Sequence, residues 1–166
     1  MAVLALVVTA CSTAPTAPTG TAEPESADSQ DVEKRVREPA RKDSDGVQVF
    51  PLRNPAVEEL IKEADGAERS GDLDQAAVLL ERALRIQPHN PETLQHMAEV
   101  QLQKKDYEQA LTFATRSYDI GPRVGEICSR NWRTISVAQE YMGNQPGAVE
   151  AEEKATSCMN TKPRRL

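Results

Sequence analysis

From Asn54 to Cys158, apolar residues recur three or four positions apart, which places successive side chains on one face of an α-helix. Asn54-Pro55 and Asn90-Pro91 each put a capping side chain before a proline at the first helical position, where no amide hydrogen is needed. Val, Ile, Phe and Tyr are too scattered for strands. The pattern predicts an all-α domain with helices at residues 55–69, 74–87, 91–104, 108–120, 127–142 and 146–158.

One helical unit, from Gly71 to Pro88, recurs along the chain. Its marker residues Gly71, Ala76, Leu80, Ala83 and Pro88 return 34 residues later as Lys105, Ala110, Ala114, Ser117 and Pro122. A third copy follows 38 residues after the second, at Gly143, Ala148, Glu152 and Ala155. A period near 34 residues is typical of tetratricopeptide repeats, which this chain resembles from about Asn54 to Cys158. The resemblance implies about three helix-turn-helix repeats, a short α-solenoid.

Small residues mark where paired helices can approach closely, and bulky residues fill the space between them. The small residues are Ala64, Ala76, Ala83, Ala98 and Ala110, and the bulky ones are Leu60, Leu80, Leu94, Leu111 and Trp132. Trp132 falls at the tryptophan position of the repeat family's pattern. We interpret it as a core residue, with stacking on a ligand as the alternative.

Residues 12–53 differ in composition from the repeats. They are rich in Pro, Ser, Thr and charged residues, and Phe50 is their only aromatic. Such a segment buries too little apolar surface to offset the entropy of ordering it. We therefore expect a disordered tether, with an end-to-end distance of about 35–40 Å as a random coil and at most ~150 Å when extended.

The first residues, MAVLALVVTAC, form an apolar run too short to span a bilayer and ending in small residues before Cys11. The motif V-T-A-C resembles the lipobox of bacterial lipoproteins, which implies that Cys11 is lipidated. Met1 leads straight into the apolar run without Lys or Arg, so we expect the true start of translation further upstream. Ser12 is not the aspartate that retains such lipoproteins at the inner membrane. The alternative is an accidental apolar N-terminus on a cytosolic protein.

The resemblance implies a location on the periplasmic face of the outer membrane, held by lipid. The expected organisation is a signal peptide at 1–10, a lipidated N-terminus and tether at 11–53, the repeat domain at 54–160 and a basic tail at 161–166.

Assigning Cys11 to lipid leaves Cys128 and Cys158. They lie at the start of one predicted helix and the end of its antiparallel partner, so the hairpin brings them together. An oxidising periplasm favours a disulfide between them. A redox-active pair is the alternative, but the C-x-x-C spacing is missing.

The sequence contains no recognisable catalytic or cofactor motif. His89 and His96 lack metal-ligand spacing, and neither a Ser/His/Asp set nor a phosphate-binding glycine loop is present. A formal net charge of −6 argues against a nucleic-acid surface. We therefore expect a protein that is not an enzyme, needs no cofactor or metal, and binds another protein.

The repeat family offers a concave face to its partners, which implies that the first helix of each repeat carries the candidate residues. The best candidates are Arg130, Arg133 and Tyr141, since Arg and Tyr are enriched in binding hot spots. The other candidates are Glu92, Gln95 and Glu99. An ordinary solvated helix face is the alternative for each position, and the convex face stays open as the binding surface.

The chain as a whole resembles the outer-membrane lipoprotein activators of class A penicillin-binding proteins in pseudomonads and relatives. The resemblance rests on the lipobox, the tether and three stretches of the repeat domain, NPAVEELIKEA, LERALRIQPHNP and RNWRTI. The resemblance implies a non-catalytic protein that activates a bifunctional peptidoglycan synthase. The alternative is an assembly or scaffold lipoprotein for pili, secretins or outer-membrane barrels.

Overall fold

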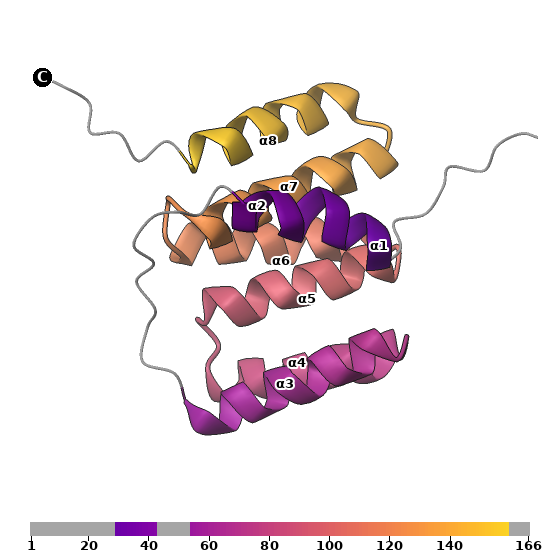
Figure 1. The fold of residues 1–166 in the computed structure, drawn as a ribbon, viewed down its shortest axis with the longest axis vertical. Helices are drawn as coiled ribbons and strands as arrows, with labels where there is room; N and C mark the ends of the chain where they lie inside the picture. The colour runs from indigo at the N-terminus through magenta and orange to yellow at the C-terminus, as the bar shows by residue number, and fades with distance from the viewer. Residues whose placement is uncertain (1–28, 43–53, 160–166) are drawn as a thin grey trace, which may run out of the picture.

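Six helices stack in antiparallel pairs in the computed structural model, which describes residues 29–42 and 54–159 (Figure 1). They are α3 (Pro55–Arg69), α4 (Leu73–Ile86), α5 (Pro91–Gln103), α6 (Tyr107–Ile120), α7 (Glu126–Tyr141) and α8 (Gln145–Ser157). Each agrees with its predicted range to within a residue at either end. The described residues contain no strand, so the predicted all-α solenoid is confirmed.

Side-chain caps fix where the helices begin. The Asn54 and Asn90 side chains accept hydrogen bonds from the amides of Ala56 and Thr93, at 2.9 and 3.0 Å, ahead of α3 and α5. In the turns within the repeats, Gly71 and Gly143 have φ of 82° and 79°. Lys105 takes the same place in the second repeat with φ of 65°, a left-handed conformation that costs a side-chain-bearing residue energy.

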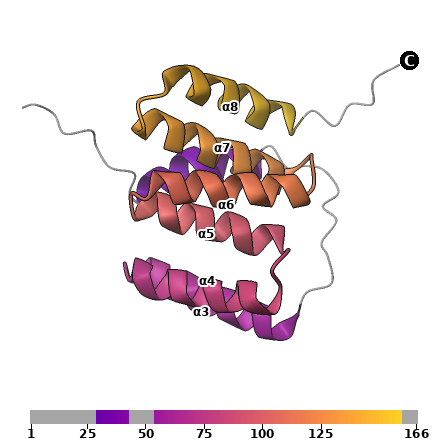
Figure 2. The same ribbon diagram turned by 180° about the vertical axis from the view of Figure 1, so that it is seen from behind.

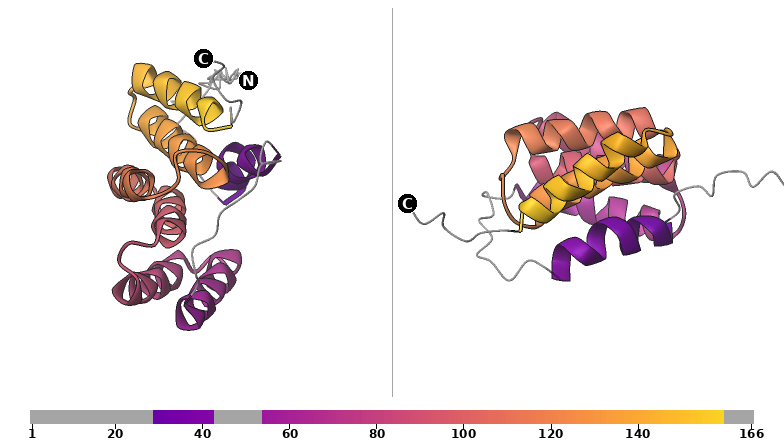
Figure 3. Two further views of the ribbon diagram at one scale, coloured as in Figure 1. Left: turned by 90° about the vertical axis from the view of Figure 1, so that its left-hand side faces the viewer. Right: turned by 90° about the horizontal axis from the view of Figure 1, so that it is seen from above.

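The small residues pack as the sequence predicted. Five alanines that were expected at helix crossings are fully buried: Ala64, Ala76, Ala83, Ala98 and Ala110. Leu80 and Leu94 are fully buried too, while Trp132 packs at the edge of the core against Tyr118, with ring centroids 4.7 Å apart. The second helices α4 and α6 lie on one side and the first helices on the other (Figures 2 and 3).

A further helix precedes the repeats, and we call it the N-terminal helix. It runs continuously through α1 (Ser29–Val32), the π-helical turn η1 (Glu33–Arg37) and α2 (Glu38–Lys42). Residues 29–42 belong to the predicted disordered tether, but in the structure they form this helix. The physical reason is an apolar stripe at i, i+4 and i+8, Val32, Val36 and Ala40, which are 1%, 0% and 0% exposed against the repeats.

Pro39 accounts for the π-helical turn. A proline inside a helix donates no hydrogen bond, and its ring clashes with the carbonyl four residues earlier. The turn just before it widens, so that the Glu38 amide donates to the Glu33 carbonyl. The rest of the predicted tether, the signal peptide and the basic tail lie outside the described residues.

The third repeat is closed by a disulfide between Cys128 and Cys158, as predicted, with Cα atoms 5.7 Å apart. The Gly125 amide also donates to the Cys158 carbonyl at 2.9 Å, so the start of α7 is joined to the end of α8 twice. This pairing offsets the lack of a further helix stacked on α8 among the described residues.

Reducing this disulfide should destabilise the domain. In the chain-entropy model, a loop of about 30 residues is worth roughly 3.5 kcal/mol. We expect the melting temperature to fall by roughly 10 °C or more when a reductant is added. The double variant Cys128→Ser/Cys158→Ser should melt at the lower temperature and no longer respond to reductant. An unchanged melting temperature on reduction would contradict a stabilising role.

Candidate functional site

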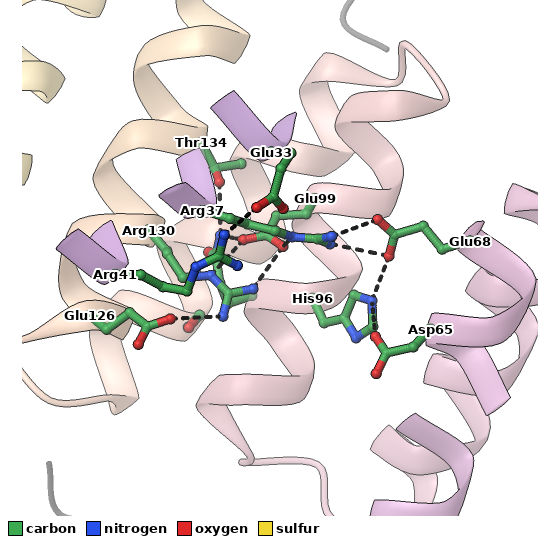
Figure 4. Close-up of polar contacts among 12 residues, drawn as sticks. Glu33, Arg37, Arg41, Asp65, Glu68, His96, Glu99, Glu126, Arg130 and Thr134 are labelled. Carbon is green, nitrogen blue, oxygen red and sulfur yellow. Dashed lines mark hydrogen bonds and ion pairs between the residues drawn. The ribbon is translucent and has the colours of Figure 1, made fainter. Parts of the chain in front are cut away.

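The first helices of the three repeats, α3, α5 and α7, lie on one side of the stack, and we call their shared inner face, which carries Glu68, Glu99 and Arg130, the groove. The N-terminal helix lies in the mouth of this groove, beside α7 (Figure 3, left). Arg37 of this helix joins one connected set of polar contacts with Glu68, Glu99 and Arg130 of the repeats (Figure 4). Residues 29–42 therefore occupy the surface that the sequence analysis assigned to a partner.

Glu99 on α5 is the centre of the network. Its side chain is fully buried, and both carboxylate oxygens accept hydrogen bonds from Arg130 on α7, at 2.8 and 2.7 Å. Arg37 of the N-terminal helix donates to the same carboxylate at 2.7 Å, and Gln95 donates at 2.9 Å. Burial opposes ionisation, but the charges of Arg130 and Arg37 outweigh it and hold the pKa of Glu99 far below its usual value.

Glu68 on α3 is the second acid beneath the N-terminal helix, and it is only 8% exposed. One oxygen accepts from Arg37 at 2.9 Å and from Gln103 at 2.7 Å. The other lies 2.8 Å from His96 Nε2, which donates because the carboxylate is ionised. Burial alone would raise the pKa of Glu68, but the hydrogen bond from His96 and the charge of Arg37 have the larger combined effect and lower the pKa to about 2. Arg37 thus links α3 to α5.

Two polar contacts hold the N-terminal end of the N-terminal helix against α7. Arg35 pairs with Glu140 at 2.5 Å, and the Tyr141 hydroxyl donates to Asp31 at 2.8 Å. The Tyr141 ring stacks on Tyr107, with centroids 5.1 Å apart. Burial and the bond to Asp31 raise the pKa of Tyr141 well above its usual value. These contacts fix the direction in which the N-terminal helix lies along the groove.

The predicted binding residues divide into three groups. Gln95, Glu99 and Arg130 do come together in the groove, but Gln95 and Glu99 are fully buried, and Arg37 of the N-terminal helix binds the same cluster in the free chain. Tyr141 lies at one end of the same face, bound to Asp31.

The other two predicted residues lie elsewhere. Glu92, near the start of α5, lines a hollow with Asn54 and Glu58. Arg133 points away from the groove and pairs with Glu152 on α8 at 2.5 Å, because it lies three residues beyond Arg130 on the neighbouring side of α7. The prediction that Arg133 belongs to the concave face is therefore wrong.

Three potential metal ligands meet between α3 and α5. Carboxylate oxygens of Asp65 and Glu68 and a ring nitrogen of His96 lie within 4.8 Å of one another. However, both Glu68 oxygens are already hydrogen-bonded, and the Arg37 guanidinium beside them disfavours a second cation. The charge of Glu68 is therefore balanced by protein side chains in this arrangement.

None of the described helices is long and apolar enough to cross a membrane.

Sequence reasoning missed Arg37 and Glu68. Arg37 was hidden in a segment of polar composition, although the apolar stripe Val32, Val36 and Ala40 was a detectable helical signal. Glu68 is one of many acids on α3, and nothing in the local sequence separates it from its exposed neighbours. Only its position opposite His96 and Gln103 makes it a buried acid.

Known proteins that are similar to this chain match it in the repeat domain. A tetratricopeptide-repeat family model matches residues 67–116. Among solved structures, the globular C-terminal domain of P. aeruginosa LpoP aligns with a TM-score of 0.60 and 34% sequence identity, over 63% of this chain and 99% of that domain. The chain belongs to this tetratricopeptide-repeat family. A search of curated proteins finds no significant match. More than a third of this chain has no counterpart in the LpoP domain.

Removing Arg130 should destabilise the fold, because it leaves the buried Glu99 with one arginine fewer. Losing one partner of a buried ion pair costs about 3–5 kcal/mol. We expect Arg130→Ala to lower the free energy of unfolding in urea by about that amount, and Glu99→Gln to recover part of the loss in the double variant. The exposed Arg85 is the matched control, and Arg85→Ala should change stability by less than about 1 kcal/mol. Equal effects of the two substitutions would contradict this account.

Stability should also fall in acid through Glu68. Its folded-state pKa of about 2 lies below the value near 4.3 expected for an unfolded chain. The stabilisation from ionised Glu68 is therefore complete above about pH 5 and is lost as the pH falls toward 2. We expect Glu68→Gln to show a shallower loss of unfolding free energy across this range than the unaltered protein. Glu59→Gln, at an exposed site on the same helix, should keep the original slope, and identical slopes for all three would refute the assignment.

Proposed function

We propose that this protein is an outer-membrane lipoprotein that binds a class A penicillin-binding protein and raises its peptidoglycan-synthesising activity. The observation that carries the proposal is the 34% identity to the LpoP domain over 99% of its length. LpoP is an outer-membrane lipoprotein activator of a penicillin-binding protein. The V-T-A-C motif ending at Cys11, which lies outside the described residues, supports the same assignment.

The proposed role is a binding role. In the concave groove, the ionised side chains that a catalyst would need are held in ion pairs: Glu99 with Arg37 and Arg130, and Glu68 with Arg37. A non-catalytic activator raises a rate by binding the active conformation of the synthase more tightly than the inactive one. Rigid repeats suit this task, because a preorganised surface loses little entropy when it binds.

The N-terminal helix changes how far an anchored head would reach. With lipid on Cys11 and residues 29–42 docked, the 18 residues from 11 to 28 span at most about 60 Å. With the helix undocked, the chain to Arg53 would span up to ~150 Å. In this proposal, docking therefore decides how far from its membrane the head can bind a synthase.

The test combines a purified system with cells. The purified chain without its lipid should increase the glycosyltransferase and transpeptidase rates of a class A penicillin-binding protein. Its Cys11→Ala variant should do so equally well in solution. In cells, Cys11→Ala should lose membrane fractionation and activation together, since a tethered partner acts through its effective concentration.

No rate increase in the purified system would refute the activator function. If the unaltered chain were found in the cytosol, the lipid anchor would be refuted instead. The scaffold alternative would be favoured if the purified chain failed to activate the synthase and cells lacking the protein showed a defect in pili, secretins or outer-membrane barrels.

A further inference from the structure

We infer that the groove between α3, α5 and α7 is a receptor for an amphipathic helix of defined chemistry, and that residues 29–42 occupy it in the free chain. The partner is a basic helix with apolar residues at i, i+4 and i+8 and an arginine at i+5. It binds by replacing the N-terminal helix. The inference concerns the groove itself and does not depend on the partner being a peptidoglycan synthase.

The apolar part of this chemistry comes from the floor of the groove. Val32, Val36 and Ala40 pack in a row, and the valines share a cluster with Leu102 and Val137. A helix laid into a groove is recognised through such regularly spaced anchors on one face. The floor therefore accepts a helix whose apolar residues repeat every four positions.

The charged part comes from the acids beneath that helix. The repeats bury Glu68 and Glu99 and supply one guanidinium, from Arg130. The second guanidinium is Arg37, which bridges the two carboxylates at 2.9 and 2.7 Å and comes entirely from the N-terminal helix. Without an occupant, Glu99 keeps only Arg130, and Glu68 keeps no arginine partner among the described residues, because Arg37 is the cation that bridges the two acids. An occupant must therefore bring an arginine at this place.

Net charge points the same way. Residues 29–42 carry five Lys or Arg and three Asp or Glu, a net charge of +2, whereas the whole chain carries −6. At the end of the groove, Glu140 receives a further arginine, Arg35. The groove thus selects a basic helix over an acidic one, since like charges at an interface are strongly disfavoured.

The N-terminal helix has the features of a replaceable occupant. It is only 14 residues long, a length at which an isolated helix is marginal in water, and it contains Pro39 and a π-helical turn. It anchors itself with two valines and an alanine, which bury less area than Leu or Phe would. Its helical order depends on the groove, so its docking is a binding equilibrium that another helix can shift.

The test uses a fluorescent synthetic peptide with the sequence of residues 29–42 as the probe. In the full chain, Val32→Asp/Val36→Asp should release the internal helix, because both side chains are buried. The peptide should bind this released variant at least about tenfold more tightly than the unaltered chain, where the internal helix competes at a high effective concentration. Circular dichroism checks that the repeats stay folded. A full chain lacking residues 29–42 is the second variant and should bind like the first.

Matched peptides test the arginine. Arg37→Ala in the peptide should weaken binding to the released variant by about tenfold or more, because the buried acids lose their cation. Lys34→Ala removes a charge from the exposed side of the same helix and should change binding less than about twofold.

Three results would overturn the inference. They are equal binding of the peptide to unaltered and released chains, no binding to either variant up to millimolar peptide, and equal losses for Arg37→Ala and Lys34→Ala. Light scattering at several protein concentrations tests whether the occupant is instead a second copy of the chain. If the unaltered chain forms dimers with rising concentration and the released variant does not, the groove exchanges helices with a second copy, and the separate partner is refuted.

Discussion

The structure depends on keeping one carboxylate ionised inside the protein. Glu99 has no exposed surface, and a buried charge is tolerated only when cations and hydrogen bonds replace the lost water. Arg130 from the third repeat and Arg37 from outside the repeats supply these cations. This electrostatic requirement ties the second and third repeats to a segment that precedes them, and Arg37 extends the link to Glu68 in the first repeat.

This requirement shapes what the concave face can do. Residues 29–42 occupy the face in the free chain, so in the proposed binding mode a partner has to compete with an internal helix before it reaches the groove. Competition of this kind reduces the apparent affinity by the fraction of molecules in which the groove is open. It also raises specificity, because a helix without the matching arginine leaves Glu68 and Glu99 short of a cation. If Cys11 carries lipid, the same event lengthens the tether.

The local sequence was sufficient for the architecture of the repeats. Caps such as Asn54 and Asn90 mark where helices begin, alanines mark where they cross, and the 34-residue period repeats both, so the bounds were predictable to within a residue. The pairing of Cys128 with Cys158 was predicted from the hairpin once Cys11 was assigned to lipid. Each of these features depends on residues close in sequence or on the repeat itself, and each is therefore visible without the fold.

The content of the groove was decided only by the tertiary structure. Composition averages over residues 12–53, and the average hid a short helix whose two valines, Val32 and Val36, pack in one cluster with the distant Leu102 and Val137. Arg130 and Arg133 lie three positions apart on α7, and the repeat pattern did not resolve that the first faces Glu99 on α5 and the second faces Glu152 on α8. Glu99 is distinguished from other acids by its ion pairs with Arg37 and Arg130, which are distant in sequence and come close to it only in the folded chain. The sequence determined the repeats, and long-range charge pairing determined which residues fill their concave face.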